Sequence, residues 1–281
     1  MGSEAYTLAR MAAIGLPVPH AVVLGPGLSH PDEAREPEAQ GELNQTLATQ
    51  LRRLESATHL TYGGSRRPLL LSVRAAAPQS APGLREGIVN VGLNEISVRG
   101  LLRMTGNPRL TWDAYRRLIQ SFAEVVDGCP SLPFDEPLNE MLERSTVARA
   151  QELDGRSLAK LTREYLAIYK KLVGKNFPQD TMEQLKAAVH GVFRSSGADE
   201  AHEYRRVRKT AEDAGTAVIV QRMVFGNAGG SSGAGAAFTR DPGSGANRLC
   251  VDFMFNAQAE DVASGRHNVI DADQLQGILP T

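Results

Sequence analysis

The chain contains 281 residues, of which 42% are hydrophobic, and its formal net charge is -1. This length and composition predict a globular protein with a sizeable core. The near-neutral charge gives no global attraction to nucleic acid or anionic lipid, so any phosphate site must be local. No apolar run approaches a membrane span, and the N-terminus lacks the regions of a signal peptide. We therefore expect a soluble cytoplasmic protein with no nucleic-acid or membrane partner.

The N-terminal part of the chain predicts alternating helices and strands. Residues 3–14 read as a helix closed by Gly15 and Pro17, the usual stop signals. Residues 20–24 and 69–73 read as strands. A helix between them carries one apolar face, formed by Leu43, Leu47, Leu51 and Leu54.

From about residue 96 to residue 174 the pattern is helical. One apolar face contains Tyr115, Leu118, Ile119, Phe122, Val125 and Val126. A second face, on a helix expected to begin at Ser157 and end at Gly174, contains Leu158, Leu161, Tyr165, Ile168 and Leu172. Residues 180–183 resemble a capping box that opens another helix, which buries Leu185, Val189, Val192 and Phe193.

After residue 216 we expect strands to the end of the chain. The most loop-like stretches are residues 37–41 and 130–137, because both are rich in turn-forming residues. The two cysteines, Cys129 and Cys250, lack metal-type spacing and are expected to be reduced thiols. A basic cluster at Arg205, Arg206, Arg208 and Lys209 is expected to be a solvated helix face.

The segment 215–242, GTAVIVQRMVFGNAGGSSGAGAAFTRDP, predicts a strand, a glycine-rich loop and a second strand. The first strand has the character of a buried strand on the side formed by Val218, Val220 and Met223, and so does the run 234–238. A loop without Cβ atoms lets backbone N–H groups approach an anion closely, as in phosphate-binding loops. A plain hairpin loop explains the composition equally well, because the chain lacks the G-x-x-x-x-G-K-[ST] motif.

Several blocks of the chain resemble, in the same order, the N-terminal domain of pyruvate, phosphate dikinase. They are LARMAAIGLPVP at 8–19, LLLSVRAAAPQSAPG at 69–83, VNVGLN at 89–94, TGNPRLTWDAYRRLIQSF at 105–122, VFRSS at 192–196, YRR at 204–206 and FNAQAEDVASG at 255–265. The glycine-rich segment is similar to the lid of the same domain. This resemblance implies an α+β, ATP-grasp-like nucleotide-binding domain with a helical-bundle insertion and an incomplete second lobe. Its parts would be 1–94 with 178–217 as the first lobe, 95–177 as the helical insert, and 218–281 as a partial second lobe with the lid.

The resemblance also implies ligands and site residues. In the family, ATP with Mg²⁺ is clamped between two lobes, and a phosphoryl group passes to a histidine on a separate domain, here implying a separate phosphohistidine-carrying partner. Arg74 matches the arginine that contacts the phosphates, although a structural salt bridge explains this cation equally well. Gln221 and Met223 match the strand that meets the adenine, or are plain strand residues. The lid glycines are Gly229, Gly230, Gly233 and Gly235, and Asp252 takes the place of a family glutamate that serves a metal or the ribose.

The chain departs from the family pattern at charged positions. A family Gly-Gly-Lys-Gly motif, whose lysine reaches the phosphates, aligns with residues 2–5, so that Glu4 replaces the lysine. Beside a polyphosphate this change removes an attraction and adds a like-charge contact, worth roughly several kcal/mol in a partly desolvated site. In the segment after Arg74, Ala76 replaces a glycine and Pro78 replaces an arginine, which removes a cation and a backbone donor.

Other functional groups of the family have no counterpart in this stretch of sequence. None of the six histidines has the Thr-Ser-His context of the phosphocarrier, and the late carboxylates Asp271 and Asp273 are expected in a surface loop. The final family strands, the phosphohistidine domain and the pyruvate-binding barrel are not found. We therefore assign no catalytic residue and no metal ligand.

Three hypotheses follow from the sequence. The chain is a dikinase-type ATP-binding domain that works with a separate phosphohistidine-carrying partner, as Arg74 and the lid glycines suggest. Alternatively, it is a degenerate, non-catalytic relative with a regulatory or protein-interaction role, as Glu4 and Pro78 suggest. The third hypothesis is a fragment of a longer enzyme. We expect weak ATP binding and no formation of phosphoenolpyruvate by the chain alone.

Overall fold

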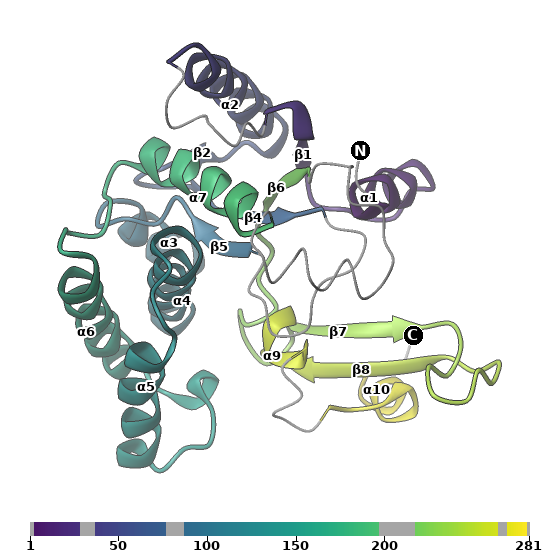
Figure 1. Ribbon diagram of the computed structural model, residues 1–281. Coiled ribbons are helices and arrows are strands. Elements are labelled where there is room, and N and C mark those ends of the chain that lie inside the picture. The colour runs from purple at the N-terminus through teal and green to yellow at the C-terminus, as the bar shows by residue number, and fades with distance from the viewer. Residues whose placement is uncertain (1–2, 29–36, 77–86, 197–216, 264–268, 280–281) are drawn as a thin grey trace. The chain divides into compact units, whose positions relative to one another are not determined.

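The computed structural model describes residues 3–28, 37–76, 87–196, 217–263 and 269–279 (Figure 1). The helices described are α1 (Ser3–Ala13), α2 (Pro37–Thr58), α3 (Ser97–Thr105), α4 (Pro108–Asp127), α5 (Leu132–Ser145), α6 (Gly155–Val173), α7 (Thr181–Ser196), α9 (Ala259–Ala263) and α10 (Ala272–Ile278), with 3-10 turns η1 (Pro26–Leu28) and η2 (Ala150–Glu152). The strands are β1 (Ala21–Leu24), β2 (Thr61–Tyr62), β3 (Pro68–Leu69), β4 (Leu71–Ala75), β5 (Gly87–Val91), β6 (Val218–Arg222), β7 (Gly233–Phe238) and β8 (Cys250–Phe255). The mixture of helices and small sheets confirms the α+β class.

The chain divides into two compact units, which are described separately below. The first unit contains Met1–Ala148 and Asp154–Met223, and the second contains Arg149–Leu153 and Val224–Thr281. The division after Met223 differs from the boundary expected at residue 218. The reason is that β6 pairs with β1 and β4, so this strand belongs to the sheet of the first unit.

The first unit is built on a four-stranded antiparallel sheet in the order β1-β6-β4-β5. Its inner strand β6 is buried along four of its five residues, Val218 to Gln221. This confirms the predicted buried strand at Val218 and Val220. It also explains the nearly continuous apolar run, because a strand covered on both faces cannot alternate with polar residues.

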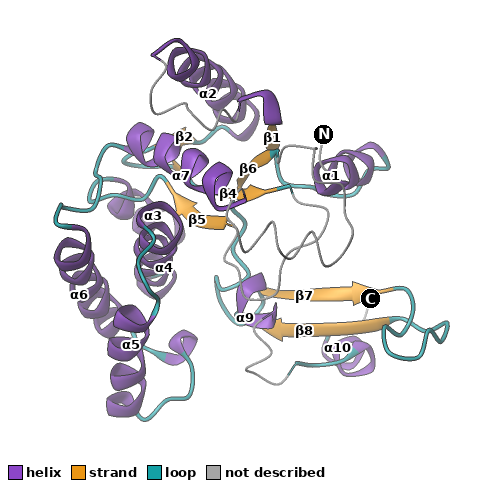
Figure 2. Cartoon of the chain, viewed as in Figure 1, coloured by secondary structure: helices purple, strands orange, loops and turns teal. Residues whose placement is uncertain are grey.

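Helices α3 to α7 account for most of the remainder of the first unit (Figure 2). Helix α7 packs on β4 and β5, while α4 packs on β5, α6 and α7. The apolar faces expected for this region are mostly buried, which confirms the helical reading of residues 96–174. None of the helices that the structure describes has the length and hydropathy of a membrane-spanning segment.

Aromatic side chains fill the contact between α4, α6 and the segment that leads to α7. The Phe177 ring lies edge-on to three others, with centroid distances of 6.1 Å to Tyr115, 5.3 Å to Phe122 and 5.2 Å to Tyr169. Edge-to-face packing of this kind adds about 0.5–1.5 kcal/mol per pair beyond the burial of apolar area. The aromatic cluster therefore joins the helices to one another through a single loop residue.

Two stretches were expected to be loops. Residues 37–41 are helical, so that expectation is wrong, and residues 130–137 are helical from Leu132 onward, so only 130–131 are non-helical. Pro37 is the first residue of α2, and α5 carries a proline in its first turn. The first N–H groups of a helix have no intrahelical acceptor, so proline loses nothing there. Helix α6 is capped by Asp154, whose carboxylate accepts from the N–H groups of Arg156 and Ser157, and not by Ser157 as expected.

The second unit contains the antiparallel pair β7 and β8 and the short helices α9 and α10. Helices 259–263 and 272–278 contradict the expectation of strands to the end of the chain. Asp271, expected in a surface loop, forms a capping box with Gln274 at the start of α10. Strand β7 is present as predicted but is largely exposed, so its predicted burial is wrong. Its glycine and alanine residues tolerate exposure, because their apolar area is small.

Candidate functional site

Arg74 lies on β4, next to the inner strand β6. In the antiparallel register Arg74 is opposite Ile219 and Ser72 is opposite Gln221. Residues that face one another across two strands share one face of the sheet. The buried residues Leu71, Val73 and Ala75 point to the opposite face. Arg74 is therefore a cation placed on one face of a well-ordered sheet.

Helix α1 covers part of this face and brings Glu4 to Arg74. Ala5 packs in a buried cluster with Ala76, Ala217 and Ile219, and Leu8 packs against the same cluster. The next residue toward the N-terminus, Glu4, forms an ion pair with Nη1 of Arg74. The two side chains retain 36% and 32% of their exposure, so the pair is reached by solvent from one side.

The charge of Arg74 makes this partner important. Burial lowers the pKa of Arg74 from its ordinary value, because a partly desolvated guanidinium loses hydration. An anion nearby offsets that loss. The sequence left open whether the anion is a phosphate or a protein carboxylate, and in this structure it is the carboxylate of Glu4.

Gln221 lies beside Arg74, whereas Met223 lies further along the same chain segment, opposite Leu70. The Oε1 atom of Gln221 is 3.4 Å from Nη2 of Arg74, and its Nε2 atom donates to the carbonyl of Pro19 at 2.9 Å. The amide of Met223 donates to the carbonyl of Leu70 at 2.9 Å. The structure thus brings Arg74, Gln221 and Glu4 together, and it does not bring Met223, which follows the last residue of β6, to this group.

The predicted lid glycines lie in the second unit and divide into two groups. A Cβ on Gly233 would lie 2.2 Å from the Phe253 ring, and one on Gly235 would lie 2.6 Å from the carbonyl oxygen of Asp252. Since real Cβ atoms do not approach so closely, these two glycines are required by the pairing of β7 with β8. Their presence therefore has a structural explanation independent of any ligand.

Gly229 and Gly230 have open space around their Cα atoms. Gly229 has a φ of +156°, a region that favours glycine, and its N–H donates to the Ser232 hydroxyl at 2.9 Å. The amide of Ser232 in turn donates to the Gly229 carbonyl at 3.1 Å. Of the four predicted glycines, these two have the free surroundings that a phosphate contact requires.

Asp252 is exposed on β8, opposite Ala236 of β7. In the described part of the chain no three His, Cys, Asp or Glu side chains gather closely enough to hold a metal ion. Mg²⁺ in nucleotide sites is usually held by one or two protein carboxylates together with phosphate oxygens, and Asp252 is one carboxylate of this kind. Pro78 and the basic cluster at 205–209 lie outside the described residues.

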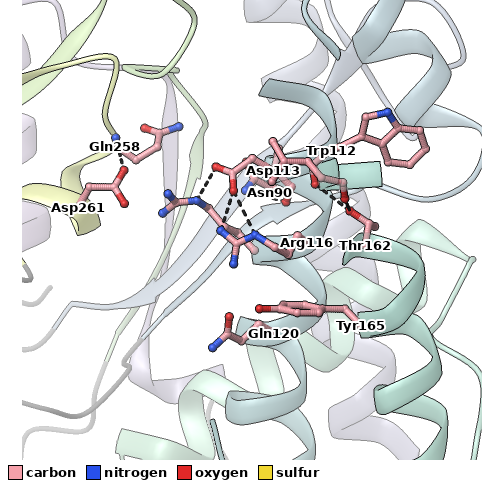
Figure 3. A network of polar contacts seen from close by, with 12 residues as sticks. Asn90, Trp112, Asp113, Arg116, Gln120, Thr162, Tyr165, Gln258 and Asp261 are labelled. Carbon is pink, nitrogen blue, oxygen red and sulfur yellow. Dashed lines mark hydrogen bonds and ion pairs between the residues drawn. The ribbon is translucent and has the colours of Figure 1, made fainter. Parts of the chain in front are cut away.

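A buried charge network, which the sequence analysis missed, lies in helix α4 of the first unit (Figure 3). Asp113 pairs with Arg116 at 2.6 Å and with Arg117 at 2.8 Å, and its side chain is only 4% exposed. The guanidinium of Arg116 lies 5.7 Å from the centre of the Tyr165 ring on α6. The spacing of three and four residues in Asp113, Arg116 and Arg117 is typical of helical ion pairs and was the available signal.

The electrostatics of this network favour ionised Asp113. Burial opposes ionisation, but the attraction of Arg117 and Arg116 outweighs it and lowers the pKa of Asp113 well below its usual range. On the adjacent strand β5, the amide of Asn90 donates to the carbonyl of Ala114 at 3.1 Å. The network therefore joins α4 to α6 and to the sheet, and its role is structural.

Comparison with known proteins identifies similar sequences. Residues 31–274 match the family model described as pyruvate phosphate dikinase, AMP/ATP-binding domain. The chain is 36% identical over its whole length to pyruvate, phosphate dikinase of Clostridium symbiosum, of which it covers 32%. It is also 36% identical to pyruvate, phosphate dikinase 1 of Arabidopsis thaliana, of which it covers 29%, and 36% identical to the Giardia intestinalis protein, of which it covers 32%. The chain thus spans about a third of the length of these curated relatives.

Proposed function

The chain belongs to the pyruvate phosphate dikinase AMP/ATP-binding domain family. We propose that it binds adenine nucleotide weakly, because the carboxylate of Glu4 already forms an ion pair with Arg74. Arg74 is the arginine expected to contact the nucleotide phosphates. The single observation that carries the proposal is the ion pair between these two residues. The family supplies the class of ligand, and the ion pair supplies the reason for weak affinity.

A nucleotide phosphate must displace Glu4 before it reaches Arg74. The exposed pair itself contributes little, about 0–1 kcal/mol for a solvated ion pair. The larger effect is that the displaced carboxylate stays on α1, close to the incoming phosphates, because Ala5 and Leu8 anchor the helix. Repulsion between two nearby anions then opposes binding. Gln221 would remain beside Arg74 as a polar neighbour.

We propose the remaining site residues on the same basis. Gln221 and Met223 would lie near the adenine, and Gly229 and Gly230 would contact phosphates through their backbone, with Gly233 and Gly235 shaping the lid. Asp252 would contact the ribose or a metal. Mg²⁺ would enter bound to the nucleotide phosphates, where it neutralises charge. The ATP-grasp arrangement of the two units is part of this proposal.

Titration calorimetry with ATP and Mg²⁺ tests the proposal. For the unaltered chain we expect no binding at micromolar nucleotide. Glu4→Gln removes the competing anion and should raise the affinity by about tenfold, equivalent to about 1.4 kcal/mol. Glu4→Lys restores a cation and should raise it further.

Two further variants make the result specific. In Arg74→Gln the gain from Glu4→Gln should shrink, because no guanidinium is left to be released. Glu140→Gln removes the carboxylate of another exposed ion pair, with Arg144 on α5, and should leave ATP affinity unchanged. Tight ATP binding by the unaltered chain, or equal affinities for the Glu4 variants, would contradict the proposal.

A non-catalytic role is the second candidate function, and the same ion pair favours it. A domain in which Glu4 pairs with Arg74, the arginine expected to contact phosphates, is better suited to regulation or protein interaction than to catalysis. Under the first candidate, a separate phosphohistidine-carrying protein would accept the phosphoryl group. A phosphotransfer assay with labelled ATP separates the two, since labelling of such a partner by the unaltered chain contradicts the non-catalytic role.

A further inference from the structure

A second cationic feature lies in the first unit, on the loop between β2 and β3 and on the adjacent helix α3. Arg66, Arg67, Arg103 and Met104 line an open cavity of about 560 Å³. Ligand cavities in proteins have volumes of about 300–1,000 Å³, so this space is large enough for a small molecule. None of these residues is among those expected to bind ATP.

Backbone hydrogen bonds close the turn that carries Arg66 and Arg67. The loop is a tight turn in which the Thr61 amide donates to the Arg67 carbonyl at 2.9 Å and the Gly64 amide donates to the Thr61 carbonyl at 3.0 Å. Its closure depends on Gly63, whose φ of +68° is in the left-handed region. Arg66 and Arg67 are therefore presented by a closed turn and not by an extended loop.

Helix α3 fixes the other side of the cavity. A Cβ on Gly100 would lie 2.8 Å from the Gly64 carbonyl oxygen, so the absence of a side chain allows the helix to touch the turn directly. Nη1 of Arg103, one turn later, donates to the carbonyl of Ser65 at 3.3 Å. These contacts hold Arg103 on the same cavity as Arg66 and Arg67.

The cavity has excess positive charge. None of the ion pairs found among the described residues includes Arg66, Arg67 or Arg103. Three guanidinium groups gathered without a carboxylate repel one another, and this repulsion is relieved by a bound anion. Guanidinium groups match phosphate oxygens in charge and in geometry, because each presents paired donors.

We propose that Arg66, Arg67 and Arg103 form a binding site for a small molecule carrying a diphosphate or polyphosphate group. The site is distinct in its residues from the proposed nucleotide site at Arg74. A neutral ligand is disfavoured, since three of the four described lining residues are arginines. Binding should weaken as salt rises, because the arginines are exposed and their charges are screened.

The test is calorimetric titration of the full chain with inorganic pyrophosphate at low and high salt. Arg66→Gln with Arg67→Gln should lower the affinity at least about tenfold, or about 1.4 kcal/mol. The matched control is Arg52→Gln with Arg53→Gln, which removes two adjacent exposed arginines from α2 and should change the affinity less than about twofold. Arg103→Gln provides an independent variant on a different element. Unchanged circular dichroism and melting temperature show that each variant is folded.

Two further titrations distinguish this site from the proposed nucleotide site and from a general anion site. If Arg74→Gln abolishes pyrophosphate binding while the Arg66 and Arg67 variant retains it, the pyrophosphate binds at the nucleotide site and the inference is overturned. Citrate, a carboxylate anion of similar charge, should bind more weakly than pyrophosphate. Equal binding of citrate, or no measurable binding of pyrophosphate at low salt, also overturns the proposal.

Discussion

Asp113→Asn is expected to lower the free energy of unfolding by about 3–5 kcal/mol at pH 7, the range measured when one partner of a buried ion pair is removed. The variant keeps the shape of the side chain but removes its charge. Arg116, whose side chain is 5% exposed, then lies buried without this counter-ion, and the ion pair between Arg117 and position 113 is lost as well. Chemical denaturation followed by the fluorescence of Trp112, the single tryptophan of the chain, reports directly on this helix.

The effect of this substitution should depend on pH. The folded-state pKa of Asp113 is lowered, so its ionised form stabilises the fold above the unfolded-state value of about 4. That contribution is lost as the pH falls through the folded-state pKa. The difference between the unaltered chain and Asp113→Asn should therefore be full at pH 7 and shrink progressively below about pH 4.

Asp154→Asn is the matched control for the Asp113 prediction. It makes the same chemical change at the exposed N-cap of α6, where asparagine is an equally good cap. We expect a loss of less than about 0.5 kcal/mol. A loss below about 1 kcal/mol for Asp113→Asn, or a loss that does not change with pH, would show that the buried pair contributes little.

Phe177→Ala is expected to destabilise the first unit by about 3–5 kcal/mol, the usual loss for a buried phenylalanine. Phe177 is 3% exposed and packs in edge-to-face geometry with Tyr115, Phe122 and Tyr169. Its removal leaves a cavity where α4 and α6 meet the segment before α7. Equilibrium unfolding in urea, again followed by Trp112 fluorescence, measures the loss.

Two comparisons test the origin of this effect. Phe177→Leu retains most of the apolar volume and should lose less than about 2 kcal/mol. Phe238→Ala removes the same side chain from β7, where it is 44% exposed, and should lose less than about 1 kcal/mol. Equal losses at positions 177 and 238 would contradict a specific role for the aromatic cluster.

The pairing of Glu4 with Arg74 changes the interpretation of two sequence observations. In the sequence, Glu4 stands where a lysine was expected, and Arg74 was expected either to contact phosphates or to form a structural salt bridge; about seventy residues separate the two along the chain. The structure places them in one ion pair. Ala76, regarded as a lost glycine, contributes to the apolar cluster that anchors the helix carrying Glu4. These departures from the family pattern lie together around Arg74.

Local patterns predicted much of the fold. Apolar periodicity identified α2, α4, α6 and α7, and β6 was identified by its run of valines. The predictions were wrong where one residue type is compatible with two different local structures. Proline signals a loop but also suits the first turn of a helix, as at Pro37. Glycine suggests a ligand-binding loop but also allows two strands to pair closely, as at Gly233 and Gly235.

The sequence by itself determined the family, the α+β class and most helices, and it supplied the candidate residues of the nucleotide site. These depend on short-range patterns and recognisable motifs. Only the tertiary structure decided which charges meet. Glu4 lies against Arg74, Asp113 lies between Arg116 and Arg117, and Arg103 joins Arg66 and Arg67 around one cavity. Electrostatic interaction depends on distance and burial, and the long-range packing of the chain sets both.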